Sequence, residues 1–307
     1  MKIYIKRTKI RGAWDWIQNG YANAWKQMDF EVLYYDLIED IYDTGEYDIM
    51  IRDWDINSDR DLRAIESARR VYFFNQPNSF PMPWGSHPNF MTKCSDEFIE
   101  KINSLDNVFL WNWGELDDKR KQEYFPKWKK MHLIPMAFDY VNYIPKYDEK
   151  YNFDVCYIGG WADNGFNEKR SIMLKQFAAF KDSNLKCGFF INKSLTHEQE
   201  NAILYSSKVC INIHDKYQRV LGLDTNERTY KALGLTGVLV NDNGAKLQMG
   251  RMFPDVLNSS TPEEMVKFVK DHVNMDSKEL QLIKEKNRQM ILENHTYVNR
   301  VKTMMEL

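Results

Sequence analysis

The stretch Asp154-Val155-Cys156-Tyr157-Ile158-Gly159-Gly160 is an apolar run that ends in two adjacent glycines. This pattern predicts a buried β-strand that closes in a tight turn. Beyond the turn, Met173, Phe177 and Phe180 recur at helical spacing, which predicts an amphipathic helix. A strand, a turn and a helix in this order make the repeating unit of a parallel α/β sheet.

The same alternation of strand-like and helix-like segments runs through the whole chain. Further strand-like segments lie at 2–6, 31–37, 47–52, 71–74, 108–111, 133–136, 185–191, 209–213 and 238–240. The polar segment 143–151 contains Pro145 and is the best linker. We therefore predict an α/β chain of two Rossmann-like domains with parallel sheets, residues 1–145 and 146–307, the second carrying a C-terminal helix. Because open parallel sheets bind ligands at the carboxyl ends of their strands, we expect the chemistry in those loops, facing a central cleft.

Bulk composition narrows the classes of protein. The 307 residues are 43% hydrophobic and carry a net charge of −2, so the chain lacks the general basic signature of nucleic-acid binders. No run approaches the roughly 20 apolar residues of a membrane helix, and residues 1–7 are too polar for a signal peptide. The four cysteines are scattered, which favours a reducing compartment. We expect a cytoplasmic protein without membrane insertion.

Several residues of the second half could bind an anion. The Gly159-Gly160 turn would let backbone N–H groups approach a phosphate, although a plain tight turn explains it equally well. Arg228 stands near the start of a helix at 227–235, and Arg170 stands in the matching place after the first strand of this half. Two phosphates placed beside Arg228 would gain from its charge and from the helix end, and the same holds for Arg170. The alternative for each is a solvated side chain.

Other kinds of site are disfavoured. The six histidines show no metal-ligand spacing, so we predict no structural zinc. No Gly-x-Ser-x-Gly elbow is present, which argues against a serine hydrolase.

Four segments in a fixed order resemble a known family. They are Val209–His214, Asn226–Leu233, Val238–Asp242 and His295–Arg300, and together they resemble the C-terminal domain of spore-maturation-type glycosyltransferases. Leu133–Asp139 resembles the junction before that domain. The likeness covers roughly residues 130 to 305.

The second half is also similar to phage DNA β-glucosyltransferases, through Asp154–Gly160, Phe189–Asn192 and Asp215–Tyr217. These resemblances imply a GT-B glycosyltransferase that uses a nucleotide-sugar, UDP-linked, as co-substrate and needs no other cofactor. The donor-binding residues that they imply are Gly159, Gly160, Arg170, Asn192, His214, Lys216, Arg228 and Lys231.

The sequence departs from the family patterns at two places. Lys231 replaces the family's glutamate that grips the donor ribose, and Thr236 stands where the family has a glycine. In the DNA-modifying enzymes a catalytic aspartate follows the fourth strand of the first domain, but this chain has Asn75-Gln76 there. A catalytic base would have to come from elsewhere, or the reaction retains configuration.

We take Asp53 as the leading candidate base and Asp15 as the next, because both follow strand-like segments of the first domain. If the strand continued, Asp55 would point the same way as Asp53, and the like charge could raise the pKa of one of the two to a useful value. The alternative is that Asp53 caps a helix near Ser58 or pairs with Arg52.

The acceptor is left open by the sequence. It could be a glycan, a protein or a small molecule. A hydroxymethylated base of phage DNA is the alternative, which the local basic run at 127–130 favours and the net charge opposes. A non-catalytic nucleotide-sugar-binding protein is the second alternative, because the family's glutamate is missing.

Overall fold

The computed structural model describes residues 1–8, 13–41, 45–56, 59–87, 90–161 and 169–307. The chain forms two compact units, one of Met1–Pro135 with Arg300–Leu307 and the other of Met136–Asn299. The division at 135/136 lies ten residues before the expected boundary at 145/146. The last eight residues belong to the first unit, where Arg300 Nε donates to the carbonyl of Pro135 at 2.9 Å.

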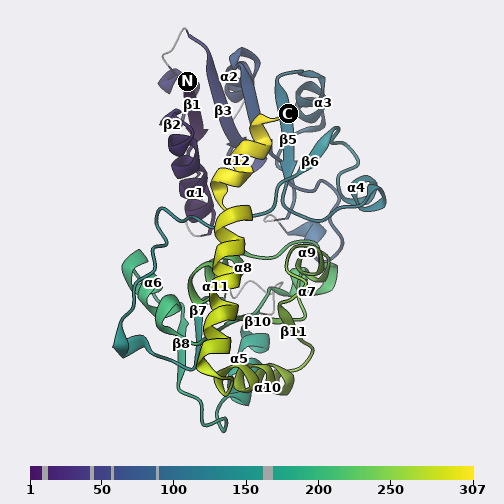
Figure 1. Cartoon of the computed structure of the whole chain (residues 1–307). Helices are drawn as coiled ribbons and strands as arrows, with labels where there is room; N and C mark the ends of the chain where they lie inside the picture. The colour runs from purple at the N-terminus through teal and green to yellow at the C-terminus, as the bar shows by residue number, and fades with distance from the viewer. Residues whose placement is uncertain (9–12, 42–44, 57–58, 88–89, 162–168) are drawn as a thin grey trace. The chain divides into compact units, whose positions relative to one another are not determined.

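The first unit is built on a six-stranded parallel sheet in the order β2-β1-β3-β4-β5-β6 (Figure 1). Its strands are β1 Lys2–Lys6, β2 Glu31–Tyr35, β3 Tyr47–Arg52, β4 Arg70–Phe74, β5 Val108–Asn112 and β6 Met131–Leu133. Its helices are α1 Ala13–Gln27, α2 Asp59–Ser67, α3 Asp96–Ser104, α4 Asp118–Tyr124 and most of α12 Tyr297–Met305. Every residue of the central strand β3 is buried, and its two charged side chains, Asp48 and Arg52, form ion pairs with Arg69 and Asp55.

The second unit is built on a five-stranded parallel sheet in the order β11-β10-β9-β7-β8 (Figure 1). Its strands are β7 Val155–Gly159, β8 Cys187–Ile191, β9 Val209–Asn212, β10 Leu239–Asp242 and β11 Leu257–Ser259. Its helices are α5 Lys169–Ala179, α6 His197–Ser206, α7 Lys216–Leu221, α8 Glu227–Lys231, α9 Lys246–Met252, α10 Pro262–Val273 and α11 Ser277–Asn294. Apolar side chains of β7, β9 and β10 pack with Met173 and Phe180, as the spacing after the first strand predicts.

The predicted fold class is confirmed, because both sheets are parallel and carry helices between successive strands. The expected helix at 227–235 is more irregular than its sequence indicates. After α8 the turns widen into a π-helix, Ala232–Thr236, which ends where Gly237 takes a left-handed φ of 79° and donates to Ala232 at 2.8 Å. Among the described helices none is long and apolar enough to cross a membrane.

Candidate active site

The carboxyl end of β7 is a glycine turn that its neighbours fit closely. A Cβ on Gly159 would lie 2.2 Å from Nη2 of Arg228, and a Cβ on Gly160 would lie 2.2 Å from Oδ1 of Asn192. Asn192 itself has a left-handed φ of 51° and donates its backbone N–H to Gly159 at 2.9 Å. Its Oδ1 accepts the N–H of Trp161 at 3.1 Å. The structure thus brings three predicted donor residues together with Arg228.

Arg228 lies in the first turn of α8 and extends across the ends of β7 and β9. Its Nε donates to the carbonyl of Ile158 at 2.6 Å, and its Nη1 donates to Oδ1 of Asn212 at 2.9 Å. The guanidinium carbon is 4.7 Å from the ring centroid of Tyr157. All these partners are uncharged. Within the described part of the chain, Arg228 forms no ion pair and its Nη2 has no hydrogen-bond partner.

The other predicted cations have different surroundings. Lys231 is buried, and its Nζ lies 3.2 Å from Oε1 of Glu200 and 3.1 Å from Oε1 of Glu227. Burial lowers the pKa of Lys231, but the two carboxylates outweigh burial and hold that pKa above its ordinary value. Lys216 is half-buried at the start of α7. Arg170 is exposed on α5, with its guanidinium 5.8 Å from the ring centroid of Trp161.

Lys169, which sequence reasoning missed, is the buried cation at the start of α5. Only 6% of it is exposed, and its Nζ lies 3.1 Å from Oδ1 of Asp215. Burial, and then the charge of Arg228, lower the pKa of Lys169. The helical period could have revealed that Lys169 is buried. It stands four residues before Met173, on the helix face that the sequence assigns to the core.

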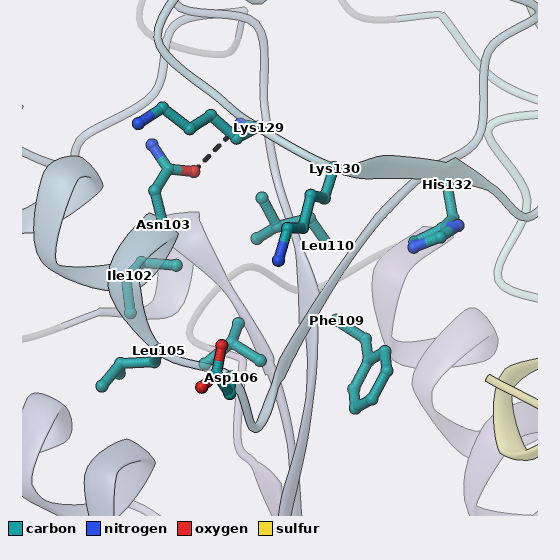
Figure 2. A pocket seen from close by; sticks show the side chains of 10 residues that line it. Ile102, Asn103, Leu105, Asp106, Phe109, Leu110, Lys129, Lys130 and His132 are labelled. Atoms are coloured by element: carbon teal, nitrogen blue, oxygen red, sulfur yellow. Dashed lines mark hydrogen bonds between the residues drawn. The ribbon is translucent and has the colours of Figure 1, made fainter.

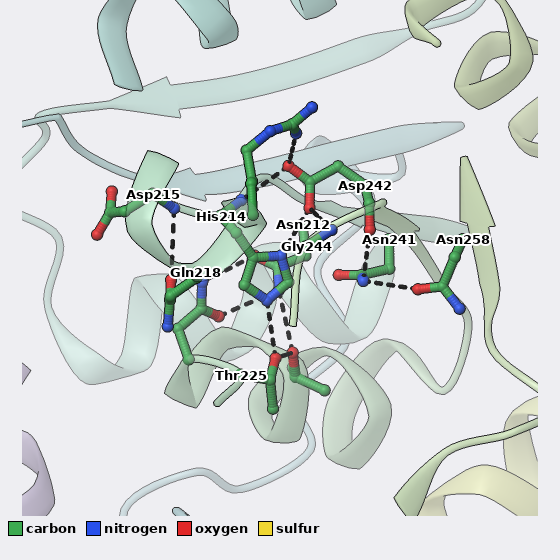
Figure 3. A network of polar contacts seen from close by, with 12 residues as sticks. Asn212, His214, Asp215, Gln218, Thr225, Asn241, Asp242, Gly244 and Asn258 are labelled. Atoms are coloured by element: carbon green, nitrogen blue, oxygen red, sulfur yellow. Dashed lines mark hydrogen bonds and ion pairs between the residues drawn. The ribbon is translucent and has the colours of Figure 1, made fainter. Parts of the chain in front are cut away.

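His214 belongs to a buried polar network (Figure 3). Its side chain is fully buried, with Nδ1 at 2.6 Å from Oδ1 of Asp242 and Nε2 at 2.9 Å from Oγ1 of Thr225. Arg219 also pairs with Asp242. Burial raises the pKa of Asp242, but His214 and Arg219 together hold it below its ordinary value. Both ring nitrogens of His214 therefore have protein partners.

Asp53, the leading candidate base, begins the turn after β3 and is 0% exposed. Its Oδ2 accepts the N–H of Gln76 at 3.1 Å, whereas its Oδ1 has no hydrogen-bond partner among the described residues. Burial raises the pKa of Asp53 to about 7. The like charge of Asp55 is not the cause, because Asp55 pairs with Arg52 at 3.2 Å.

The other expectations around Asp53 have mixed outcomes. The suggested pairing of Asp53 with Arg52 is replaced by the pair of Arg52 with Asp55, and Ser58 lies outside the described residues. Asp15 lies within the first turn of α1 rather than in a loop, and it is half-buried. Gln76 follows β4, the fourth strand, and Asp53 follows the neighbouring strand β3. Through its hydrogen bond to Gln76, the carboxylate of Asp53 therefore lies next to the position after the fourth strand.

A separate cavity of about 120 Å³ lies at the amino ends of β5 and β6 (Figure 2). Half of its lining residues are apolar, and the polar half includes Asp106, Lys129 and Lys130. Lys130 has a left-handed φ of 51°, and Figure 2 shows its side chain directed over the cavity. Strand carboxyl ends lie at the opposite edge of the sheet, so this cavity is separate from the Asp53 region. In the described residues no group of three histidine, cysteine or carboxylate side chains is arranged to hold a metal ion.

Comparison with known proteins identifies the family. The family model of glycosyl transferase-like domains matches residues 151–306, which include the whole glycine turn and Arg228. The chain belongs to this glycosyl transferase-like family. No curated protein matches the sequence of this glycosyltransferase.

Solved structures match this glycosyltransferase over nearly its full length. OtsA in its apo form has 10% identity and a TM-score of 0.59, with 99% of this chain and 98% of that chain covered. BGT of phage T4 in complex with UDP-glucose has 12% identity and a TM-score of 0.56, with coverages of 99% and 97%. Anabaena Alr3699/HepE in complex with UDP and glucose has 10% identity and a TM-score of 0.54, with coverages of 100% and 98%. These likenesses confirm the GT-B fold.

Proposed function

We propose that this glycosyltransferase takes its sugar from a UDP-linked donor and binds the donor diphosphate in its second unit, beside Arg228. The observation that carries the proposal is the state of Arg228, a fixed cation held only by uncharged partners. Its Nη2 lies where a side chain of residue 159 would otherwise be. An anion at the glycine turn would supply the missing counter-charge.

The reaction needs such a cation. When the bond between the sugar and the diphosphate breaks, negative charge develops on the leaving phosphate oxygens. Arg228 would stabilise that charge. Lys169 lies near enough for the charge of Arg228 to lower its pKa, but its ammonium is already paired with Asp215. The solved structures of T4 BGT and HepE are complexes with UDP-glucose, or with UDP and glucose, which supports a uridine nucleotide.

We assign acceptor chemistry to the first unit, with Asp53 as the base that takes the acceptor's proton and Asp15 as the second candidate. A pKa near 7 suits a general base at neutral pH. Because Asp53 is 0% exposed, an acceptor would reach its carboxyl only after a local rearrangement. Asp15 is more accessible, because it is only half-buried in the first turn of α1.

The acceptor that we favour is a glycan, a protein or a small molecule. A hydroxymethylated base of DNA is the second candidate, favoured by Lys129 and Lys130, which are exposed and form no ion pair within the described ranges. The rest of the basic run is engaged, since Lys127 pairs with Asp96 and Trp128 is buried.

The experiment is a calorimetric titration with UDP, followed by transfer assays with a panel of UDP-, GDP- and TDP-sugars. Arg228→Ala should weaken UDP binding by about 10–100-fold, the loss of one charge-assisted hydrogen bond. Lys175→Ala, which removes an exposed charge from α5, is the control. Unchanged UDP affinity in both Arg228→Ala and Arg170→Ala would refute the assignment. Binding without sugar transfer or donor hydrolysis would favour a non-catalytic protein.

A further inference from the structure

We propose that Asn212 is a positioning residue for the donor diphosphate, because it holds Arg228 through a neutral amide and leaves the charge of Arg228 to the ligand. This inference rests on the proposed donor site. It concerns a residue at the end of β9 that is not among the donor-binding residues implied by the resemblances.

The amide of Asn212 is fully used and can adopt only one orientation. Its Oδ1 accepts from Nη1 of Arg228 at 2.9 Å and from Nδ2 of Asn226 at 3.2 Å. Its Nδ2 donates to Oδ1 of Asn226 at 3.1 Å and to Oγ1 of Thr229 at 3.0 Å. A reversed amide would place N–H groups against the guanidinium, which has no acceptor. The oxygen of Asn212 must therefore face Arg228.

The orientation is anchored by the buried network behind Asn212 (Figure 3). Oγ1 of Thr229 lies 2.6 Å from Oγ1 of Thr225, which lies 2.9 Å from Nε2 of His214. His214 in turn is bound to Asp242 at the end of β10. Because this chain of hydrogen bonds is almost fully buried, rotating Asn212 would break contacts in several elements at once. The network keeps Arg228 in place before any ligand arrives.

Arg228 differs from the neighbouring cations because its side-chain partner is the neutral amide of Asn212 and not a carboxylate. Lys169 has a carboxylate partner in Asp215, Lys231 has two in Glu200 and Glu227, and Arg219 has Asp242. A carboxylate at position 212 would pair with the guanidinium and cancel much of its field at the glycine turn. An apolar residue would leave Nη1 without an acceptor, and Arg228 would be held only by the bond from its Nε to Ile158. Asparagine fixes Arg228 without neutralising it.

Two substitutions separate the tether from the charge. Asn212→Asp keeps an acceptor for Arg228 but adds a negative charge, whereas Asn212→Ala removes the tether and adds none. We expect Asn212→Asp to weaken UDP binding by about tenfold or more. Asn212→Ala should weaken it by a smaller factor of about three. Ligand-observed NMR should show unchanged affinity for uridine in both variants, because uridine carries no phosphate for Arg228 to bind.

The wild-type titration separates this inference from the proposed function. If wild-type protein does not bind UDP, the donor site and this inference fall together. Two results would refute the role of Asn212 and leave the donor site in place, provided that the wild type binds UDP. One is that Asn212→Asp binds UDP as well as the wild type does. The other is that Asn212→Ala loses as much UDP affinity as Asn212→Asp. Equal losses for UDP and uridine would show a merely structural role. Should Asn212→Asp fail to fold, wild-type UDP affinity in Asn212→Ala alone overturns the inference.

Discussion

Replacing Asp53 with asparagine should make the stability of the first unit less sensitive to pH. Burial raises the pKa of Asp53 from 3.8 to about 7, so the folded protein keeps this proton between about pH 4 and pH 7. The unfolded chain releases it in the same range. Because the folded state binds more protons than the unfolded state there, the free energy of unfolding falls as pH rises from about 4 to about 7. Asparagine cannot ionise and avoids this loss.

The magnitude follows from the pKa and from the complete burial of the side chain. At about 1.36 kcal/mol per pH unit, a rise from 3.8 to about 7 corresponds to about 4 kcal/mol. The difference in unfolding free energy between Asp53→Asn and wild type should therefore grow by about this amount between pH 4 and pH 8. The amide oxygen can still accept the N–H of Gln76, so the hydrogen bond that holds the segment after β4 is retained.

Urea unfolding followed by tryptophan fluorescence measures this difference, because eight of the nine tryptophans lie in the first unit. All other titrating groups are common to both proteins and cancel in the comparison. A difference that stays constant from pH 4 to pH 8 would refute the argument that Asp53 is protonated by burial.

The same variant tests the catalytic role of Asp53. If Asp53 is the base, turnover in Asp53→Asn should fall by about 10²–10⁴-fold while UDP affinity is unchanged. Asp15→Asn is the matched variant for the second candidate. Near-normal turnover in Asp53→Asn would leave the pH-dependent stability intact and remove Asp53 as the base.

Two further predictions concern the second unit, and each has a matched control. Gly159→Ala should lower UDP affinity by about tenfold in calorimetry, because its Cβ would lie 2.2 Å from Nη2 of Arg228, while Gly250→Ala, with open space around it, should bind normally. An unaffected Gly159→Ala would contradict the close fit of the turn. Lys169→Met should lose more UDP affinity than Arg170→Met, because Lys169 is buried within the influence of Arg228 and Arg170 is exposed. A larger loss in Arg170→Met would instead favour Arg170 as the donor-binding residue.

Much of the fold could be predicted from sequence because buried parallel strands are short apolar runs. All of β9 and the first three residues of β7 are buried, as expected for apolar strands in a parallel sheet. Gly159 and Gly160 mark the turn at the end of β7. The short strand β11 was missed, since its sequence Leu257–Ser259 has one apolar residue and two of its three residues are exposed. The return of the last eight residues to the first unit was missed because it depends on packing between segments far apart in sequence.

Lys231 has carboxylate partners within the protein, and the prediction that follows from them is about stability. Position 231 suggested a donor contact, yet its ammonium is buried between Glu200, 31 residues away, and Glu227, one helical turn away. Lys231→Met would leave two carboxylates without their cation, which should cost about 3–5 kcal/mol of unfolding free energy. Lys146→Met, which breaks an exposed pair with Glu198, should leave the unfolding free energy nearly unchanged, because water screens the pair. Chemical unfolding followed by circular dichroism measures both. UDP affinity should stay within about twofold of wild type, because Arg228 keeps its own partners in Ile158 and Asn212. A Lys231→Met protein of normal stability that has lost UDP binding would show instead that the ammonium serves the donor.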